Sequence, residues 1–236
     1  GEDIRTNNEG LISGTNWDGT KKLSKGVAIG SILHTDEDSH LEICRYSSGS
    51  GFWKTTHLPY VSGKIPFVNI FKMVISFLKR PLSFFKMYFV KDWAKSTATL
   101  LFMQTLDSKL TFKKNKIGVF SSRLSEGKKP RTFIPRAEEL AKKYAKIING
   151  NASVFALEPL AGIPSTAHIL GGAVMGKDVN EGVIDKNNLV FGYKNLLIID
   201  GSMISANPGV NPSLSITAIA ENAMSKIKNK WYFLQH

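Results

Sequence analysis

The chain of 236 residues has one cysteine, Cys44, which excludes an internal disulfide framework. Nothing near Cys44 promises a thiolate, so we expect it to be a buried apolar filler. No apolar stretch reaches the roughly 20 residues that a membrane crossing needs. Residues 1–5 lack the basic start and apolar core of a signal peptide. The sequence therefore predicts a cytoplasmic or peripheral membrane protein, and the absence of an initiator Met indicates a chain that begins inside a longer protein.

Acidic residues are scarce, because 19 Asp and Glu stand against 31 Lys and Arg, a net charge of +12. A basic chain is typical of nucleic-acid binders. Here, however, the lysines are scattered and no helix-turn-helix, zinc or single-strand-binding motif accompanies them. The five histidines also lack zinc spacing. We expect no nucleic-acid partner and no metal, and attraction to an anionic membrane surface accounts for the charge.

A further absence is the GxGxxG turn, or any equivalent glycine-rich turn from strand to helix, that binds dinucleotides. What the chain does contain is concentrated between residues 168 and 227. Residues 196–199 are an unbroken apolar run, typical of a strand buried on both faces of a parallel sheet. Ligands of such sheets bind beyond the strand ends, which makes Asp200 and Gly201 candidate cofactor contacts. The alternative is a plain turn at the end of the strand.

A helix is predicted to follow, with Asn211 as its N-cap, Pro212 as its first residue and a mostly apolar run through residue 220. The N–H groups and partial positive charge at its start favour an anionic group. A reduced flavin carries such charge on one edge of its ring and is one ligand that fits.

These features occur in a fixed order. They are His168, Gly171, Gly172, Gly176, Val183, Asp185, Gly192, Asn195, Leu196, Asp200, Gly201, Ser202, Gly209, Val210, Asn211 and Pro212. In this order and spacing, the block resembles the C-terminal part of the glucose-methanol-choline (GMC) oxidoreductases, and within them the cholesterol-oxidase branch.

The resemblance implies FAD as cofactor and oxidation of an alcohol, a sterol 3-hydroxyl, by hydride transfer to the flavin. It implies that His168 positions the hydroxyl group and helps to remove its proton, while Asn211 polarises the substrate oxygen or the flavin edge. The Pro212 and Ser213 backbone would lie against the pyrimidine ring. Thr6 and Asn7, with Glu9 after them, resemble a segment near the flavin, although by themselves they indicate only a turn.

Strands are predicted at residues 27–34 and 41–46 as an antiparallel pair. In the second strand, Leu41 and Ile43 face one way while Glu42 and Cys44 face the other. An ordinary edge-strand charge is the default interpretation of Glu42. The resemblance implies instead a pocket glutamate that moves a proton on the steroid ring, in a double-bond isomerisation after oxidation.

Residues 66–93 contain Phe67, Phe71 and Leu78 at helical spacing, with Asn69 and Lys72 in a polar stripe opposite them. One interpretation is a pair of helices that cover the substrate sheet. The other is an interfacial element whose Phe-rich and Lys-bearing faces contact a membrane surface.

Further strands are predicted at 99–106 and, after a turn at Asp107, at 109–112; residues 118–129 are a loop or edge strand, and 136–148 a helix. The predicted class is α+β: an antiparallel substrate domain with covering helices, plus the C-terminal portion of a Rossmann-like FAD-binding domain. We expect residues 1–20 to belong to the FAD-binding domain, 21–165 to bind substrate, and 166–236 to return to the FAD-binding domain.

In the family, the GxGxxG turn lies near the N-terminus and binds the ADP part of FAD. The resemblance therefore covers only the C-terminal half of a complete enzyme. The chain is a piece of one, a split gene product that needs a partner chain, or a remnant, and alone we expect it to retain no FAD and to be inactive. Two alternatives remain: a non-catalytic lipid- or membrane-binding fragment, and a GMC dehydrogenase for another alcohol such as a sugar or choline.

Overall fold

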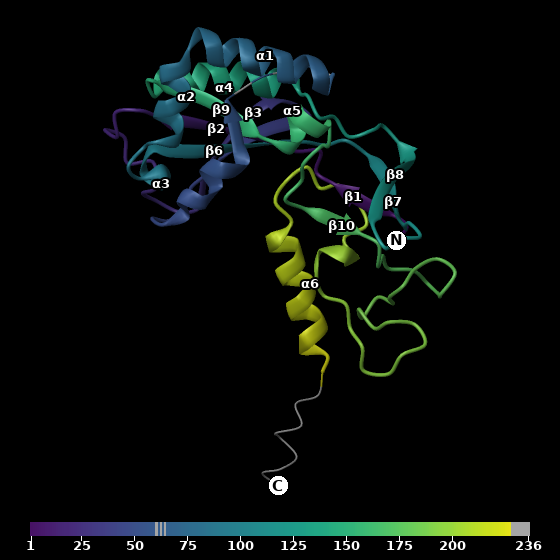
Figure 1. The fold of residues 1–236 in the computed structure, drawn as a ribbon. Helices are drawn as coiled ribbons and strands as arrows, with labels where there is room; N and C mark the ends of the chain where they lie inside the picture. The colour runs from purple at the N-terminus through teal and green to yellow at the C-terminus, as the bar shows by residue number, and fades with distance from the viewer. Residues whose placement is uncertain (60, 62, 64, 228–236) are drawn as a thin grey trace. The chain divides into compact units, whose positions relative to one another are not determined.

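A computed structural model describes residues 1–59, 61, 63 and 65–227 (Figure 1). The chain divides into two compact units. The smaller unit comprises Gly1–Asn7, Thr105–Lys129 and the chain from His168 onward; the larger comprises Asn8–Gln104 and Pro130–Ala167. Each unit has its own antiparallel sheet with helices, which confirms the predicted α+β class. Both units are discontinuous in sequence, and the assignment of substrate and cofactor roles to continuous ranges stays a prediction.

The larger unit is built on a six-stranded sheet in the order β3-β4-β6-β2-β9-β5. Its strands are β2 (Gly10–Asn16), β3 (Ile29–Asp36), β4 (Ser39–Cys44), β5 (His57–Pro59), β6 (Thr97–Gln104) and β9 (Gly150–Phe155). Every neighbouring pair is antiparallel. The strands predicted near residues 27–34, 41–46 and 99–106 are confirmed, as is the pairing of the first two.

Helix α4 (Pro135–Ile147) packs on this sheet against β2 and β9 (Figure 1). Its inward residues include Ala137, Ala141 and Ala145, spaced four apart and all buried. Small side chains let the helix approach the strands closely. The hydrophobic core between this helix and the sheet contains Ile12, Leu41, Leu100, Phe102, Ile134, Ala137 and Ala141. Leu140 and Tyr144 are partly buried and pack against it. The helix predicted at 136–148 is confirmed.

Helices α1 (Pro66–Lys79) and α2 (Pro81–Tyr88) form as predicted, but α1 is turned opposite to an ordinary covering helix. Its only buried residue is Asn69, whose Nδ2 donates to the carbonyl oxygens of Gly63 (3.0 Å) and Pro159 (3.3 Å). The apolar stripe faces outward, with Phe67 80%, Phe71 63% and Leu78 70% exposed. The prediction that these side chains cover the substrate sheet is wrong, because they are exposed; of the polar stripe, Asn69 is buried while Lys72 and Lys79 are exposed. None of the described helices has the length and apolarity of a membrane span.

Shorter helical elements complete the larger unit: η1 (Ser50–Thr56), α3 (Trp93–Ser96) and α5 (Leu157–Ala161). The smaller unit holds β1 (Ile4–Thr6), β7 (Ser108–Lys114), β8 (Phe120–Gly127), β10 (Ile169–Gly171), η2 (Gly201–Met203) and α6 (Ser213–Ser225). Its sheet has the order β10-β1-β7-β8. Of the two structures predicted for residues 118–129, a loop or an edge strand, the edge strand β8 is the one that forms. Strands β6 and β7 are separated by only a short turn, yet they belong to different sheets.

Residues 196–199 are not a buried parallel strand, so that prediction is wrong. Leu196 is 45% exposed, and the run makes one isolated antiparallel bridge, from Leu197 to Leu189. The amide of Ile198 donates to the Asn188 carbonyl oxygen (3.1 Å). A strand needs a neighbour along its length, whereas these backbone contacts of the run are made with the preceding loop.

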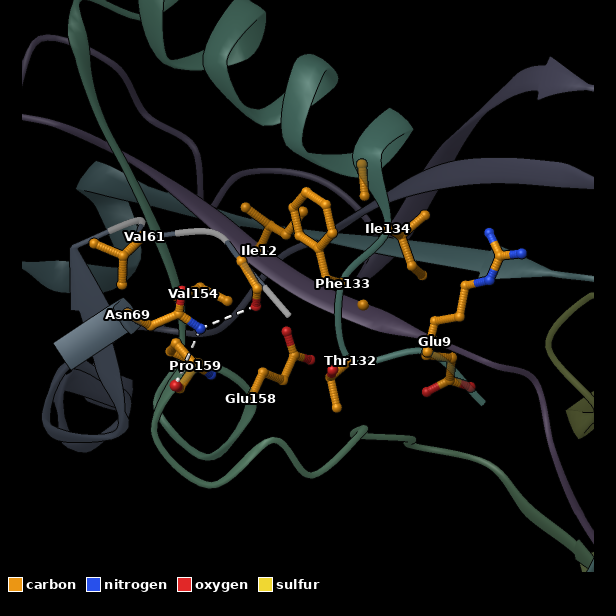
Figure 2. Close-up of a pocket in the computed structure, with 14 residues that line it drawn as sticks. Glu9, Ile12, Val61, Asn69, Thr132, Phe133, Ile134, Val154, Glu158 and Pro159 are labelled. Atoms are coloured by element: carbon orange, nitrogen blue, oxygen red, sulfur yellow. Dashed lines mark hydrogen bonds between the residues drawn. The ribbon is translucent and has the colours of Figure 1, made fainter. Parts of the chain in front are cut away.

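A small cavity of about 20 Å³ lies in the larger unit between Ile12, Ile134 and Val154, with Glu9 and Glu158 also in its wall (Figure 2). Such a volume suits about one water molecule. Glu158 is 7% exposed and accepts hydrogen bonds from the Leu11 amide (3.4 Å) and from the Ser165 hydroxyl. Burial raises the pKa of its carboxyl group to about 7, against the opposing effect of these two hydrogen bonds.

The raised pKa of Glu158 predicts that stability falls with pH. Because the folded state binds this proton more tightly, its contribution is complete below pH 4.5 and is lost as pH rises through about 7. The loss amounts to about 3 kcal/mol. Glu158→Gln cannot ionise and should flatten this fall, measured by urea unfolding across that pH range. Glu37→Gln, which removes an exposed carboxylate from the same unit, should leave the fall intact. Parallel pH profiles for the wild type and Glu158→Gln would contradict the prediction.

Candidate active site

The pairing of β1 with β10 places Asn7 opposite His168 in the smaller unit. Arg5 pairs with Leu170 and Thr6 with Ile169, so the next rung of this antiparallel ladder joins residue 7 to residue 168. The strands approach so closely that a Cβ on Gly171, where φ is +73°, would lie 2.0 Å from the Asp3 carbonyl oxygen. This explains why a glycine occupies position 171, because any side chain there would force the strands apart.

The Asn7 side chain connects His168 to the segment that leads into Asn211. Asn7 is fully buried, and its Nδ2 donates to the Val210 carbonyl oxygen at 2.9 Å. The same nitrogen lies 3.4 Å from Nδ1 of the half-buried His168. The structure thus brings together the two parts of the chain that the sequence singled out for chemistry.

The loop before Asn211 packs against Thr105 and Leu106, which precede β7. Asn207 donates to the Leu106 carbonyl oxygen at 3.1 Å, and its own Oδ1 accepts from the Gly209 amide at 2.8 Å. Gly209 has φ +66°, and a Cβ there would lie 2.2 Å from the Thr105 hydroxyl. Only glycine fits this approach, so the position of Val210 and Asn211 is fixed by backbone packing.

Helix α6 begins at Ser213, with Pro212 as its N-cap and no side-chain cap. The prediction that Asn211 caps this helix is therefore wrong by one residue, because the first intrahelical bond, from the Ile216 amide, is accepted by the Pro212 carbonyl (2.9 Å). Asn211 is half-buried one step before the cap. The first-turn amides of residues 213–215 precede the first intrahelical donor, so they are suited to hold an anionic group.

Asp200, Gly201 and Ser202 form the start of η2. The Asp200 Oδ1 accepts from the Ser202 amide at 2.8 Å and from its hydroxyl, and these bonds hold the pKa of Asp200 below its usual range. The Ser202 carbonyl accepts from Ala173, just beyond Gly172 (3.0 Å). Asp200 thus has a structural role as a cap. Contact of Asp200 or Gly201 with a cofactor stays a prediction.

Glu42 belongs to the larger unit, on β4, and is 4% exposed. Its Oε1 lies 3.2 Å from Nε2 of the equally buried His40. It shares a face of the strand with Cys44, whose pKa rises to about 11 through burial and through the charges of Glu42 and Glu9. Cys44 is therefore a neutral thiol rather than a nucleophile. The buried position departs from an exposed edge-strand charge, and the proton-transfer role of Glu42 stays a prediction.

In the sequence, Asn7 and Glu9 by themselves indicated only a turn, although the resemblance placed them near the flavin, and Glu158 was not singled out. Glu9 is 1% exposed and accepts from the Ala167 amide, one residue before His168. A signal was present, since three consecutive polar residues at 7–9 separate two strand-like segments. Their burial depends on long-range pairing and so could not be deduced locally.

Comparison with known proteins places this arrangement in a family. Residues 129–220 match the GMC oxidoreductase family model. The chain is 40% identical over 233 residues to a cholesterol oxidase of Acinetobacter baumannii, covering 98% of this chain and 42% of that protein. It is 37% identical over 236 residues to a cholesterol oxidase of Mycobacterium tuberculosis H37Rv, covering 96% and 41%.

The chain thus spans about two fifths of the length of these curated relatives. Among solved structures, pyridoxine 4-oxidase from Mesorbium loti is similar with a TM-score of 0.48 and 14% identity, over 96% of this chain and 43% of that one. The family model and the two relatives together show that the chain belongs to the GMC oxidoreductase family.

Proposed function

We propose that the protein containing this chain oxidises an alcohol with FAD as cofactor, and that the alcohol is a sterol with a 3-hydroxyl group. The observation that carries the proposal is the Asn7 side chain, which contacts both His168 and the Val210 carbonyl beside Asn211. An imidazole, an amide and a helix start with no side-chain cap are thus gathered in one small unit. The names of the relatives, both cholesterol oxidases, support the sterol.

The residues fit part of FAD. The amides of residues 213–215 suit the anionic edge of a reduced flavin, and the Pro212 and Ser213 backbone would lie against its pyrimidine ring. When bound, FAD supplies the acceptor for a hydride from the alcohol carbon. The sequence has no glycine-rich turn for the ADP part, so those contacts must come from elsewhere. We therefore expect these 236 residues alone to retain no FAD; copurification of one FAD per chain would contradict this.

In this proposal His168 hydrogen-bonds the substrate hydroxyl and Asn211 contacts the substrate oxygen or the flavin edge. Both groups are half-buried, so they can be reached while water remains limited. Glu42 would hold the proton that moves in a subsequent isomerisation, a role that its burial supports. An enzyme for a sugar or choline would use the same two residues, so the choice of a sterol depends on the relatives.

His168→Ala in the flavin-loaded enzyme should lower the rate of sterol oxidation by roughly 10²–10⁴-fold, because the hydroxyl group loses its hydrogen-bonding partner. The absorbance spectrum of the bound flavin should be unchanged, since the His168 imidazole is not proposed to hold the cofactor. Anaerobic bleaching of the flavin by cholesterol, and by choline or glucose for comparison, measures the rate. His34→Ala, which removes an exposed imidazole on β3, is the control and should be near wild type. An unchanged rate in His168→Ala would remove His168 from the mechanism.

We further propose that α1 and α2 contact an anionic membrane surface. Besides Phe67, Phe71 and Leu78, the apolar side chains of Leu82 (73%) and Phe89 (78%) are exposed. The sequence has no Asp or Glu from residue 43 to 91, while Lys72, Lys79, Arg80, Lys86 and Lys91 accompany the two helices. Exposed apolar side chains that are flanked by basic residues, with no acidic residue among them, suit the boundary between acyl chains and anionic headgroups. A protein that delivers its site to a lipid substrate would use such a surface.

The double variant Phe67→Ser/Phe71→Ser should lose at least about tenfold in affinity for vesicles of phosphatidylcholine with phosphatidylserine, because it removes the side chains that enter the bilayer. Lys72→Glu/Lys79→Glu should weaken binding to these vesicles but not the residual binding to phosphatidylcholine alone. Ile117→Ser, an exposed apolar residue of the smaller unit, is the control. Cosedimentation measures binding. Equal binding by all variants, or burial of this surface in a homodimer seen by light scattering, would contradict the proposal.

A further inference from the structure

Helix α1 is held on the larger unit through its contacts with α5. At its start, Pro66 lies against Gly162, where an added Cβ would come within 3.2 Å of the proline ring. Nearly one turn further on, the buried Asn69 donates a hydrogen bond from Nδ2 to the Pro159 carbonyl oxygen at 3.3 Å. The position of α1, and with it the presentation of its exposed apolar stripe, therefore depends on where α5 lies.

Helix α5 is held in turn by the carboxyl group of Glu158, the residue before Pro159. The pairing of β9 with β2 ends at Ile12, and the next β2 amide, that of Leu11, donates to Glu158 Oε1 at 3.4 Å. The Ser165 hydroxyl group donates to the same oxygen. A continuous set of contacts thus runs from strand β2 through Glu158 and Pro159 to α1.

Glu158 and Asn69 both line the cavity of about 20 Å³ (Figure 2). Asn69 Oδ1 is buried and has no hydrogen-bond partner among the residues that the structure describes. One water molecule fills such a volume and can bridge this oxygen to the Glu158 carboxyl group. A neutral carboxyl group needs no further solvation, whereas a carboxylate buried with a single water is poorly hydrated.

The charged groups around Glu158 do not offset this cost. Glu9, in the cavity wall, is itself a carboxyl group and accepts from the Ala167 amide. Arg131 lines the cavity but is exposed to solvent, and Lys72 of α1 lies beside Gly63. Burial prevails and raises the pKa of Glu158 to about 7, so this group changes its charge in the neutral range.

We propose that Glu158, Pro159 and Asn69 form a proton-dependent latch, which holds α1 in place while the Glu158 carboxyl group is neutral and loosens when it ionises. The carboxylate draws water into the cavity. Strands β2 and β9 are fixed by their ladder, so the wall that yields is formed by α5 and α1. The inference rests on the membrane contact proposed above, and it predicts that this contact weakens as pH rises.

Cosedimentation of the full protein with vesicles of phosphatidylcholine and phosphatidylserine tests the latch. Wild-type affinity should fall by up to about tenfold from pH 6 to pH 8, the limit for one proton with a pKa of about 7. Glu158→Gln stays neutral and should bind equally at both pH values. Glu37→Gln, an exposed change in the same unit, should show the wild-type fall.

Hydrogen exchange measured by mass spectrometry follows α1 without a membrane. After correction for the intrinsic rates, α1 of the wild type should exchange at least about threefold faster at pH 8 than at pH 6, while α4 should not change. Glu158→Gln should abolish the difference. Asn69→Ala, which removes the bond to Pro159, should exchange rapidly in α1 at both pH values.

A wild-type α1 whose corrected exchange is the same at pH 6 and pH 8 would overturn the inference, and this comparison depends on no variant. Vesicle binding with the same pH dependence in wild type and Glu158→Gln would also overturn it, while the membrane contact would stand. Proton-dependent exchange of α1 in a protein that binds no vesicles would instead remove the membrane contact and leave the latch.

Discussion

The antiparallel pairing of β1 with β10 is the constraint on which the candidate site depends. Three rungs, Ile4 with Gly171, Arg5 with Leu170 and Thr6 with Ile169, join segments more than 160 residues apart in the sequence. A slip of one residue would reverse which side chains face each side and would separate Asn7 from His168. Gly171 stabilises this register, because only a residue without Cβ fits against the Asp3 carbonyl.

Three consecutive buried residues after β1 serve two separate hydrogen-bond networks. Asn7 bonds within the smaller unit, to Val210 and His168. Asn8 bonds within the larger unit, to the Gln104 side chain (2.9 Å) and the Arg131 amide (2.8 Å), and Glu9 bonds to the Ala167 amide. These partners lie where the chain passes from one unit to the other. Buried polar groups must be satisfied, so within each unit these segments are held by side-chain hydrogen bonds.

The larger unit shows the same principle in α1. Hydrophobic spacing alone places the Phe-rich stripe against the sheet, yet Asn69 is the residue that is buried. Its two hydrogen bonds to carbonyl oxygens satisfy backbone groups near Gly63 and Pro159, and these would be costly to leave unpaired. The apolar stripe is left outward beside a set of cations, which gives the unit a surface with the composition of a lipid-facing element.

The sequence by itself determined the elements with strong local signals. Alternation identified β3, β4 and β6, helical periodicity identified α1, α2 and α4, and the spacing of His168, Gly209 and Asn211 identified the family and its candidate residues. It failed at residues 196–199, because an apolar run does not say whether a neighbouring strand exists, and at the orientation of α1, because periodicity does not say which stripe is buried.

Only the tertiary structure decided that Asn7 touches His168, that Glu42, Glu9 and Glu158 are buried, and that β6 and β7 belong to different sheets. Each of these follows from contacts between residues far apart in the chain. Local propensity is set by neighbours in sequence, whereas burial, hydrogen-bond partners and the pKa of Glu158 are set by neighbours in space. The sequence therefore identified the candidate residues, and the long-range β1–β10 pairing decided which of their atoms meet.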